Sequence, residues 1–337
     1  MQLSPGKRAG LQALSDERGI IAALALDQRT ALRKIFAQAS GLPPDRVSTA
    51  QLVEFKELVS RALTPYASAI LLDPEYGLAA AATRHPRTGL LLAYEQSGYD
   101  RSVPGRLPRL LENCSAAKLK SAGANALKVL LYYSPFSSGQ INAKKQDWVA
   151  RVGAECVASD LAFFLELVSY HDDLDEKTVD FARIKPDSVT GSVEEFCHPR
   201  YAVDVLKVGV PVNMKFVEAP GVSASQALYS RTQALTLFRR ASDAATLPFI
   251  YLSEGVGNAM FVDALSLAAE AGSAFSGVLC GRAIWQAGVT AFVRGGRAAL
   301  EDWLAGEGAR NIQAVNAQLS AAHPWFEKSL PASSHSA

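Results

Sequence analysis

The stretch DVLKVGVPV, residues Asp204–Val212, decides the fold of this chain. Apart from Lys207, its interior consists of apolar and small residues, which is typical of a parallel β-strand that is covered on both faces. Comparable apolar runs recur along the sequence, and longer amphipathic segments separate them. This rhythm predicts repeated β/α units.

Seven further runs are expected to be strands: Ile20–Asp27, Ser68–Gly77, Gly89–Glu95, Asn125–Tyr133, Phe163–Tyr170, Leu247–Gly255 and Ser276–Ala283. Eight βα units in 337 residues fit an α/β fold of the TIM (β/α)8 barrel class. A Rossmann-like open sheet is the alternative fold, although no GxGxxG pattern follows the first run.

Amphipathic segments predict helices over 49–66, 107–123 and 258–272, and two more helical regions over 140–160 and 289–319. Thr49 and Asn258 are expected to cap two of these helices at their amino ends. Gly123 and Gly272 are expected to end two helices in the left-handed conformation.

The domain organisation is expected to be simple, because no long linker interrupts the chain. A single barrel domain is predicted over residues 1–330, with an N-terminal helix and a C-terminal helical region. The small, polar tail PASSHSA, residues 331–337, is predicted to be disordered.

The composition narrows the class of partner. Lysine plus arginine, 34 residues, nearly balances aspartate plus glutamate, 33 residues, so no broad basic field favours nucleic acid. The four cysteines form no CxxC pair, the five histidines form no HExxH motif, and no segment resembles a signal peptide or a membrane span. We therefore expect a cytoplasmic protein with a small-molecule partner, no nucleic acid or membrane partner, no cofactor and no metal; a homo-oligomer is possible.

Charged residues interrupt several of the apolar runs. Period-2 alternation places Lys128, Glu166 and Lys207 each on one face of its strand, and Asp27 ends the first run. An unpaired charge on either dry face of a barrel strand would be costly. These side chains are therefore predicted to point inward and to pair at the upper end of the barrel, where barrel enzymes keep their chemistry. The alternative is a buried ion-pair network that only holds the barrel together.

The inward position gives Lys207 a chemical role. Burial and a second ammonium, which Lys128 could supply, both disfavour the charged form of a lysine. A neutral amine attacks a carbonyl group to form a Schiff base, and the iminium accepts electrons when a neighbouring carbon–carbon bond breaks. Glu166 is a candidate proton carrier for these steps.

The last two strands carry a candidate phosphate site. SEGVGN, Ser253–Asn258, follows the seventh strand, and its glycines allow backbone N–H groups to approach a ligand. Arg282, in CGRA, follows the eighth strand and can bind phosphate in a bidentate manner. The loops after strands seven and eight form the usual phosphate cradle of this fold.

Long motifs carry a family resemblance: ALALDQR, LTPYASAILLDPEYGL, GLLLAYEQSGYD, GRLPRLLENCSAAKLKSAGANALKVLLYYSP, RVGAECVASDLAFFLELVSY, DVLKVGVPVNMKFVE, LPFIYLSEGV and GVLCGRAIW. They closely resemble the class I tagatose 1,6-bisphosphate aldolase family, of the DeoC/LacD type. The resemblance runs from about residue 14 to residue 285. It implies a metal-independent TIM-barrel aldolase that cleaves a ketohexose bisphosphate to dihydroxyacetone phosphate and glyceraldehyde 3-phosphate.

The resemblance also implies a role for each matching residue. Lys207 is implied to be the Schiff-base lysine, Glu166 its proton mediator, and Lys128 a second lysine of the pocket. Asp27 and Gln28 are implied to hold substrate hydroxyls and to assist bond cleavage. The phosphate-binding positions implied by the resemblance are Ser253, Gly255, Gly281 and Arg282.

Two positions differ from the family pattern. The resemblance predicts a small residue where Glu254 stands and an acidic residue where Gly209 stands. A carboxylate that pointed into the phosphate loop would repel a phosphate. These departures bear on the substrate, and an aldolase for 6-deoxy-6-sulfofructose 1-phosphate is the alternative. A separate alternative is a non-catalytic regulator that binds a sugar phosphate on the same barrel.

Overall fold

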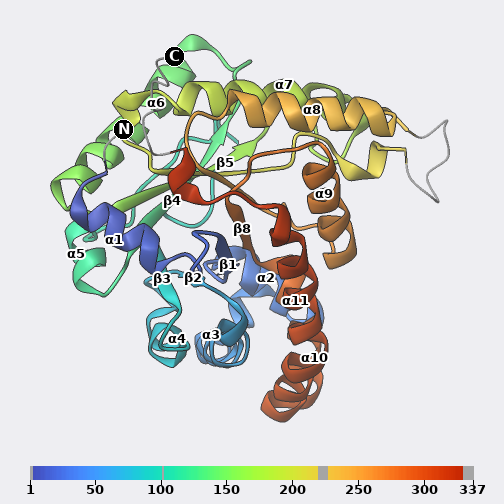
Figure 1. Cartoon of the computed structure of the whole chain (residues 1–337). Coiled ribbons are helices and arrows are strands. Elements are labelled where there is room, and N and C mark those ends of the chain that lie inside the picture. Colours follow the sequence, from blue (N-terminus) through green and yellow to red (C-terminus); the bar gives the residue numbers. More distant parts are fainter. Residues whose placement is uncertain (1–2, 101, 219–226, 329–337) are drawn as a thin grey trace.

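The eight expected strands form one closed parallel barrel in the computed structural model, which describes residues 3–100, 102–218 and 227–328 (Figure 1). Each strand pairs with its neighbours in the sequence, and β8 closes the barrel against β1. This topology confirms the TIM barrel and overturns the Rossmann-like alternative. The strands are β1 (Ile21–Ala25), β2 (Ala69–Leu72), β3 (Gly89–Ala93), β4 (Ala126–Tyr133), β5 (Ala162–Ser169), β6 (Val205–Val208), β7 (Phe249–Tyr251) and β8 (Gly277–Cys280).

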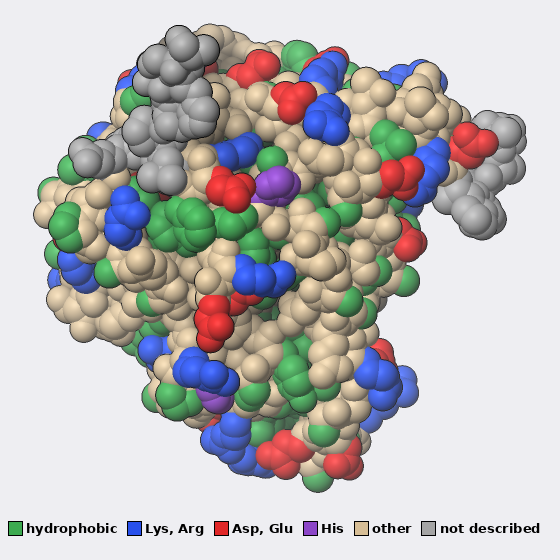
Figure 2. Space-filling view, viewed as in Figure 1, with side chains coloured by type: hydrophobic (Ala, Val, Ile, Leu, Met, Phe, Trp, Pro, Cys, Tyr) green, Lys and Arg blue, Asp and Glu red, His purple; other side chains and the backbone are tan. Residues whose placement is uncertain are grey.

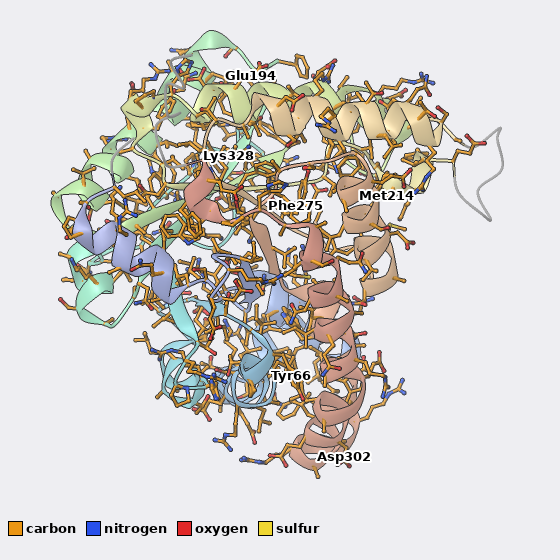
Figure 3. The ribbon with its side chains drawn as sticks, viewed as in Figure 1. Tyr66, Glu194, Met214, Phe275, Asp302 and Lys328 are labelled. Carbon is orange, nitrogen blue, oxygen red and sulfur yellow. The ribbon has the colours of Figure 1, made fainter. Side chains whose placement is uncertain are left out.

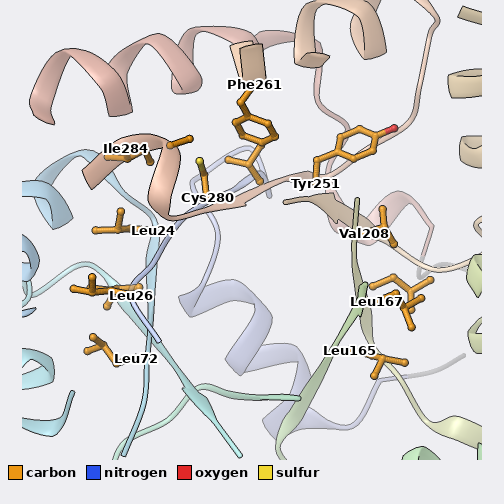
Figure 4. Packing of buried hydrophobic residues seen from close by; sticks show 14 of the residues in the cluster. Leu24, Leu26, Leu72, Leu165, Leu167, Val208, Tyr251, Phe261, Cys280 and Ile284 are labelled. Atoms are coloured by element: carbon orange, nitrogen blue, oxygen red, sulfur yellow. The ribbon is translucent and has the colours of Figure 1, made fainter. Parts of the chain in front are cut away.

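Alternation along the strands separates two apolar layers. Residues such as Ala126, Phe164 and Val205 belong to a cluster inside the barrel. Their strand neighbours, such as Leu165 and Val208, belong to the larger cluster between the barrel and the surrounding helices (Figure 4). Because both faces are covered, the strands are apolar on both sides, as the continuous runs in the sequence predicted.

Helices follow the strands and surround the barrel. They are α1 (Pro5–Ala13), α2 (Thr30–Ser40), α3 (Thr49–Leu63), α4 (Leu78–Thr83), α5 (Ala116–Ser121), α6 (Gly139–Ala158), α7 (Val179–Phe196), α8 (Arg231–Ala244), α9 (Asn258–Glu270), α10 (Arg282–Trp303) and α11 (Ala309–Ala317). The predicted helical regions over 140–160 and 289–319 correspond to α6 and to α10 with α11. Gly123 and Gly272 have positive φ angles of 92° and 65°, as expected for residues that end helices.

Three details of the helix predictions were wrong: the cap assigned to Thr49, the cap assigned to Asn258, and the extent of the helix over 107–123. The cap of α3 is Ser48, whose side chain accepts from the backbone, while Gln51 reaches back in a capping box; α9 is preceded by Gly257. Most of the predicted helix over 107–123 is not helical: the helix is confined to α5, and Leu110 forms an antiparallel bridge with Glu95. The Ser115 side chain caps α5 by accepting from the backbone N–H of Lys118, so the helix begins at Ala116 rather than at residue 107.

Both ends of the chain close the bottom of the barrel. Leu11 and Leu14, in and just after α1, join the inner apolar cluster together with Trp325. The backbone N–H of Trp325 donates to the carbonyl of Gly19. Farther along, Lys328 Nζ donates to the carbonyl of Ala245 (Figure 3).

No helix among the described residues is long and apolar enough to cross a membrane. The face seen in Figure 2 carries side chains of both charge signs, interspersed. The predicted tail, residues 331–337, and the predicted domain boundary at residue 330 lie outside the described residues.

Candidate active site

Four of the residues singled out from the sequence meet at the carboxyl ends of the strands. Lys128, Glu166 and Lys207 lie on β4, β5 and β6, and Asp27 follows β1. Each of the three strand residues lies two positions after a residue of the inner cluster and so shares its face of the strand. Its side chain therefore enters the barrel. The upper layer of the barrel is therefore charged, while the layers below it are apolar.

Lys128 is the centre of this charged layer. Its Nζ lies 2.8 Å from Asp27 Oδ2, 2.9 Å from Glu95 Oε1 and 2.7 Å from Glu166 Oε2, and its side chain is almost wholly buried. Burial alone would lower the pKa of Lys128, but the three carboxylates outweigh burial and raise the pKa well above its usual value. Lys128 is thus a fixed positive charge.

Glu166 connects the two lysines. The same oxygen, Oε2, lies 2.7 Å from Lys128 Nζ and 2.9 Å from Lys207 Nζ. Burial would raise the pKa of the Glu166 carboxyl, but Lys128 and Lys207 outweigh it and lower the pKa. The sequence suggested that one ammonium would stand directly beside the other; instead, a carboxylate lies between them and offsets their repulsion.

Asp27 and Gln28 lie together beside the lysines. Burial would raise the pKa of Asp27, but Lys128 and Lys207 hold it well below its ordinary value. Gln28 Nε2 donates to Asp27 Oδ1 at 3.1 Å. Within the described part of the chain, the buried Gln28 Oε1 has no hydrogen-bond partner. This oxygen can therefore accept a hydrogen bond from a hydroxyl group of a ligand.

Of the four predicted phosphate positions, Gly255 and Arg282 are in direct contact, while Gly281 and Ser253 contact neighbouring residues. A Cβ added to Gly255 would lie 2.8 Å from Arg282 Cζ, so the guanidinium packs directly on the glycine. Gly281 packs against the first strand, since a Cβ there would lie 2.6 Å from the carbonyl oxygen of Ala25. Ser253 is buried, and its side chain forms a hydrogen bond with the Cys280 thiol.

A pocket adjoins this group. It has a volume of about 590 Å³ and is lined by Gly255, Asn258 and Arg282, together with Ile35 and Gln38 of α2. Arg282 is the first residue of α10, so the amino end of that helix lies at the pocket. A cation and a helix amino terminus together favour an anion.

Sequence reasoning missed several residues of the site. Glu95 supplies the third carboxylate around Lys128, and Arg29 donates to the Glu95 carbonyl at 2.6 Å. Fully buried Lys56, in α3, donates to the carbonyl of Leu26 and pairs with Asp73 after β2. Glu95 and Asp73 come at the ends of apolar runs, just as Asp27 does. That shared position in the sequence could have identified them as site residues.

Candidate metal ligands are absent from the part of the chain that the structure describes. No group of three or more histidine, cysteine, aspartate or glutamate side chains there could hold a metal ion. The carboxylates of Asp27, Glu95 and Glu166 converge on the Lys128 ammonium.

The chain is similar to known aldolases over nearly its whole length. The chain is 49% identical over 330 residues to tagatose 1,6-diphosphate aldolase 2 of Enterococcus faecalis, covering 97% of this chain and 98% of that protein. It is 46% identical over 330 residues to tagatose 1,6-diphosphate aldolase of Streptococcus pneumoniae, covering 97% of this chain and 100% of the relative.

Solved structures share the fold at low sequence identity. A Plasmodium falciparum fructose-bisphosphate aldolase matches with a TM-score of 0.69 and 13% identity, covering 95% of this chain and 96% of that chain. A Schiff base forming fructose-1,6-bisphosphate aldolase matches with a TM-score of 0.55 and 15% identity, covering 92% of this chain and 98% of that chain. The family profile described as DeoC/LacD family aldolase matches residues 21–287. The chain therefore belongs to the DeoC/LacD family of aldolases.

Proposed function

We propose that this protein is a class I aldolase that cleaves tagatose 1,6-bisphosphate to dihydroxyacetone phosphate and glyceraldehyde 3-phosphate. The observation that carries the proposal is the contact between Glu166 and the two lysines, because it combines a nucleophile and a proton carrier inside a closed barrel. The similarity of nearly the whole chain to tagatose 1,6-diphosphate aldolases supports the choice of sugar.

Lys207 is the nucleophile in this proposal. Its Nζ adds to the C2 carbonyl carbon of the open-chain ketose, and the carbonyl oxygen takes up a proton to give a carbinolamine. A second proton transfer releases that oxygen as water and leaves an iminium. Glu166 lies 2.9 Å from Lys207 Nζ, close enough to exchange protons with groups formed there.

The carbon–carbon bond breaks in the next step. The electron pair of the C3–C4 bond moves into the iminium, the C4 hydroxyl loses its proton, and glyceraldehyde 3-phosphate leaves. Asp27 and Gln28 are positioned to hold substrate hydroxyls, and Lys128 keeps Asp27 ionised. Protonation of the resulting enamine and hydrolysis of the iminium release dihydroxyacetone phosphate and restore the amine.

The phosphate groups require cationic and backbone partners. Arg282 and the turn that contains Ser253 and Gly255 are proposed to hold one phosphate of the substrate, since the guanidinium packs on Gly255 beside the amino end of α10. A homo-oligomeric state and a cytoplasmic location remain predictions, which light scattering on the purified protein and cell fractionation can test.

A trapping experiment tests the proposal. The protein is incubated with dihydroxyacetone phosphate and borohydride, and the product is examined by intact mass and peptide mapping. We expect a reduced adduct on the peptide that contains Lys207. Binding of the ligand without an adduct would support the regulator and contradict the aldolase; faster cleavage of 6-deoxy-6-sulfofructose 1-phosphate than of the bisphosphate would replace the sugar but keep the chemistry.

A further inference from the structure

The two positions that depart from the family pattern lie side by side in space. Val208 of β6 is in register with Tyr251 of β7, and the backbone N–H of Leu252 donates to the carbonyl of Val208 (Figure 4). Gly209 follows directly on β6, and Glu254 is the third residue after the end of β7. Their neighbourhood is therefore set by the strand pairing of the barrel rather than by a loose loop.

The Glu254 carboxylate occupies the space that a side chain at position 209 would need. A Cβ added to Gly209 would collide with Glu254 Oε1 and would lie 2.7 Å from Glu254 Cδ. The same carboxylate forms an ion pair of 2.5 Å with Nζ of Lys185, a buried lysine of α7. Residue 209 must be glycine for this arrangement to fit.

Glu254 also belongs to the turn of the proposed phosphate site. The φ angles of Glu254 and Gly255 are 50° and 79°, and the N–H of Val256 donates to the Ser253 carbonyl at 3.0 Å. Two consecutive left-handed residues inside such a hydrogen bond are the geometry of a type I′ turn. This conformation disfavours a residue with a side chain, and the ion pair with Lys185 can offset that cost for Glu254.

The turn separates two opposite charges. The Glu254 carboxylate lies against Gly209 and Lys185, whereas the Arg282 guanidinium packs on Gly255, with its Cζ 2.8 Å from where a Cβ would be. Since Lys185 offsets the negative charge, the carboxylate does not cancel the attraction of Arg282 for an anion.

We propose that Glu254, Lys185 and Gly209 act together as a positioning unit for the phosphate of the substrate. The resemblance predicts an acidic residue at 209 and a small residue at 254; here the turn after β7 supplies a carboxylate in the space that a side chain at 209 would need. Glu254 is then a positioning residue, because it fixes the turn without contacting the substrate. The inference rests on the proposed function, since it takes the phosphate group as the ligand of this turn.

The test moves the carboxylate back. Five variants of the intact protein are compared with wild type: Glu254→Ala, Glu254→Gln, Lys185→Met, Gly209→Glu, and the double variant Gly209→Glu/Glu254→Ala. Each is titrated with inorganic phosphate by calorimetry and assayed for KM and kcat with tagatose 1,6-bisphosphate. Circular dichroism and thermal unfolding show which variants are folded.

We expect Glu254→Ala, Glu254→Gln and Lys185→Met to raise the phosphate Kd and KM about tenfold, with kcat changed less than about threefold, because only positioning is lost. Gly209→Glu alone is expected to bind phosphate as poorly, since two carboxylates would crowd one lysine. The double variant is expected to recover phosphate Kd and KM to within about threefold of wild type.

Glu270→Gln is the matched control. Glu270 lies in α9, the helix that follows the turn, and forms a surface ion pair with Arg231. Its loss should leave phosphate Kd and KM unchanged, which separates the loss of this particular pair from the loss of any acidic residue nearby.

Three outcomes overturn the inference: wild type that does not bind inorganic phosphate, Glu254→Gln that binds it as wild type does, or a folded double variant no better than Glu254→Ala. Failure of the proposed function is distinguishable. Wild type that neither cleaves the sugar nor forms the Lys207 adduct would end the aldolase proposal, while the phosphate titrations alone would still support or overturn the positioning unit.

Discussion

Glu166 and Lys207 face each other in register on the neighbouring strands β5 and β6, and Glu166 Oε2 lies 2.9 Å from Lys207 Nζ. Residues in register on adjacent parallel strands project to the same side of the sheet. The distance between proton carrier and nucleophile is therefore determined by the backbone pairing of two barrel strands. Sites on strands are held more precisely than sites on loops.

Replacing Lys207 should abolish cleavage. We expect Lys207→Ala to lose at least about a thousandfold in kcat, because the amine that forms the iminium is removed. Lys207→Arg should be equally inactive, since a guanidinium does not form a Schiff base at neutral pH. Coupled assays of aldehyde release, with circular dichroism as a check on folding, measure this; near-normal turnover in folded Lys207→Ala would disprove the role.

Glu166→Gln should slow Schiff-base formation. The amide keeps the size of the side chain but removes the negative charge between Lys128 and Lys207 and the capacity to carry a proton. We expect a loss of about a hundredfold or more in kcat, with a smaller change in KM. Single-turnover trapping with borohydride measures the rate; a rate equal to that of wild type would remove Glu166 from the mechanism.

Lys128→Met should destabilise the protein and make it acid-sensitive. Removing the ammonium leaves Asp27, Glu95 and Glu166 without their shared cation, and loss of one partner of a buried ion pair costs about 3–5 kcal/mol. The pKa values of Asp27 and Glu166 are lowered in the folded state, so their contribution is present above the ordinary carboxyl range and is lost as pH falls through the lowered values.

The acid-unfolding midpoint of Lys128→Met should accordingly lie at higher pH than that of wild type. Urea denaturation between pH 7 and pH 3 measures both effects. Lys34→Met, at an exposed position in α2, is the control and should change the free energy of unfolding by less than about 0.5 kcal/mol. An unchanged acid midpoint in folded Lys128→Met would contradict the proposed electrostatics.

Lys145 should make stability rise with pH above neutrality. It is fully buried in α6, and its Nζ donates to the Tyr170 hydroxyl at 2.8 Å. Burial lowers the pKa of Lys145 to about 7, and the charge of Arg106 acts in the same direction. Between this value and the ordinary lysine value the unfolded chain binds more protons than the folded one, so stability increases with pH in that window.

Lys145→Met should remove this increase. The difference in unfolding free energy between Lys145→Met and wild type should therefore shift in favour of wild type from pH 7 to pH 10. The adjacent, exposed Lys144 provides the control, and Lys144→Met should follow the wild-type pH profile. Parallel profiles for Lys145→Met and wild type would show that Lys145 does not titrate in this range.

Chelators should not affect cleavage. In the proposed reaction the iminium on Lys207 accepts the electrons of the broken bond, which is the task that a metal would otherwise perform. Dialysis against EDTA followed by an assay in metal-free buffer should give the same kcat as untreated enzyme. A large loss that is restored by a divalent cation would contradict the Schiff-base proposal.

Local sequence patterns were enough to predict the barrel. Each apolar run coincides with a strand, and alternation along β4, β5 and β6 correctly placed Lys128, Glu166 and Lys207 on the inner face. The reason is physical: a charge in a strand that is covered on both sides can only be satisfied in a shared polar layer. Position within a strand is thus a long-range signal.

Contacts that depend on how a helix or loop is oriented against the barrel were not predictable in this way. The pair of Lys56 with Asp73 joins α3 to the end of β2, and the pair of Lys185 with Glu254 joins α7 to the end of β7. Periodicity places Lys56 on a helix but does not give the depth to which its side chain penetrates. Glu254 appeared to be an unfavourable charge until its partner was visible.

The hydrogen bond between Trp325 and Gly19 has a consequence for biosynthesis. The apolar floor of the barrel combines Leu11 and Leu14 with Trp325, which lies more than 300 residues later, so the nascent chain cannot complete the floor until Trp325 has left the ribosome. Contacts between such distant residues also slow folding, because the ends must find each other first. Leu11 and Leu14 therefore lack part of their apolar cover until that point, and apolar surface left exposed during folding favours aggregation.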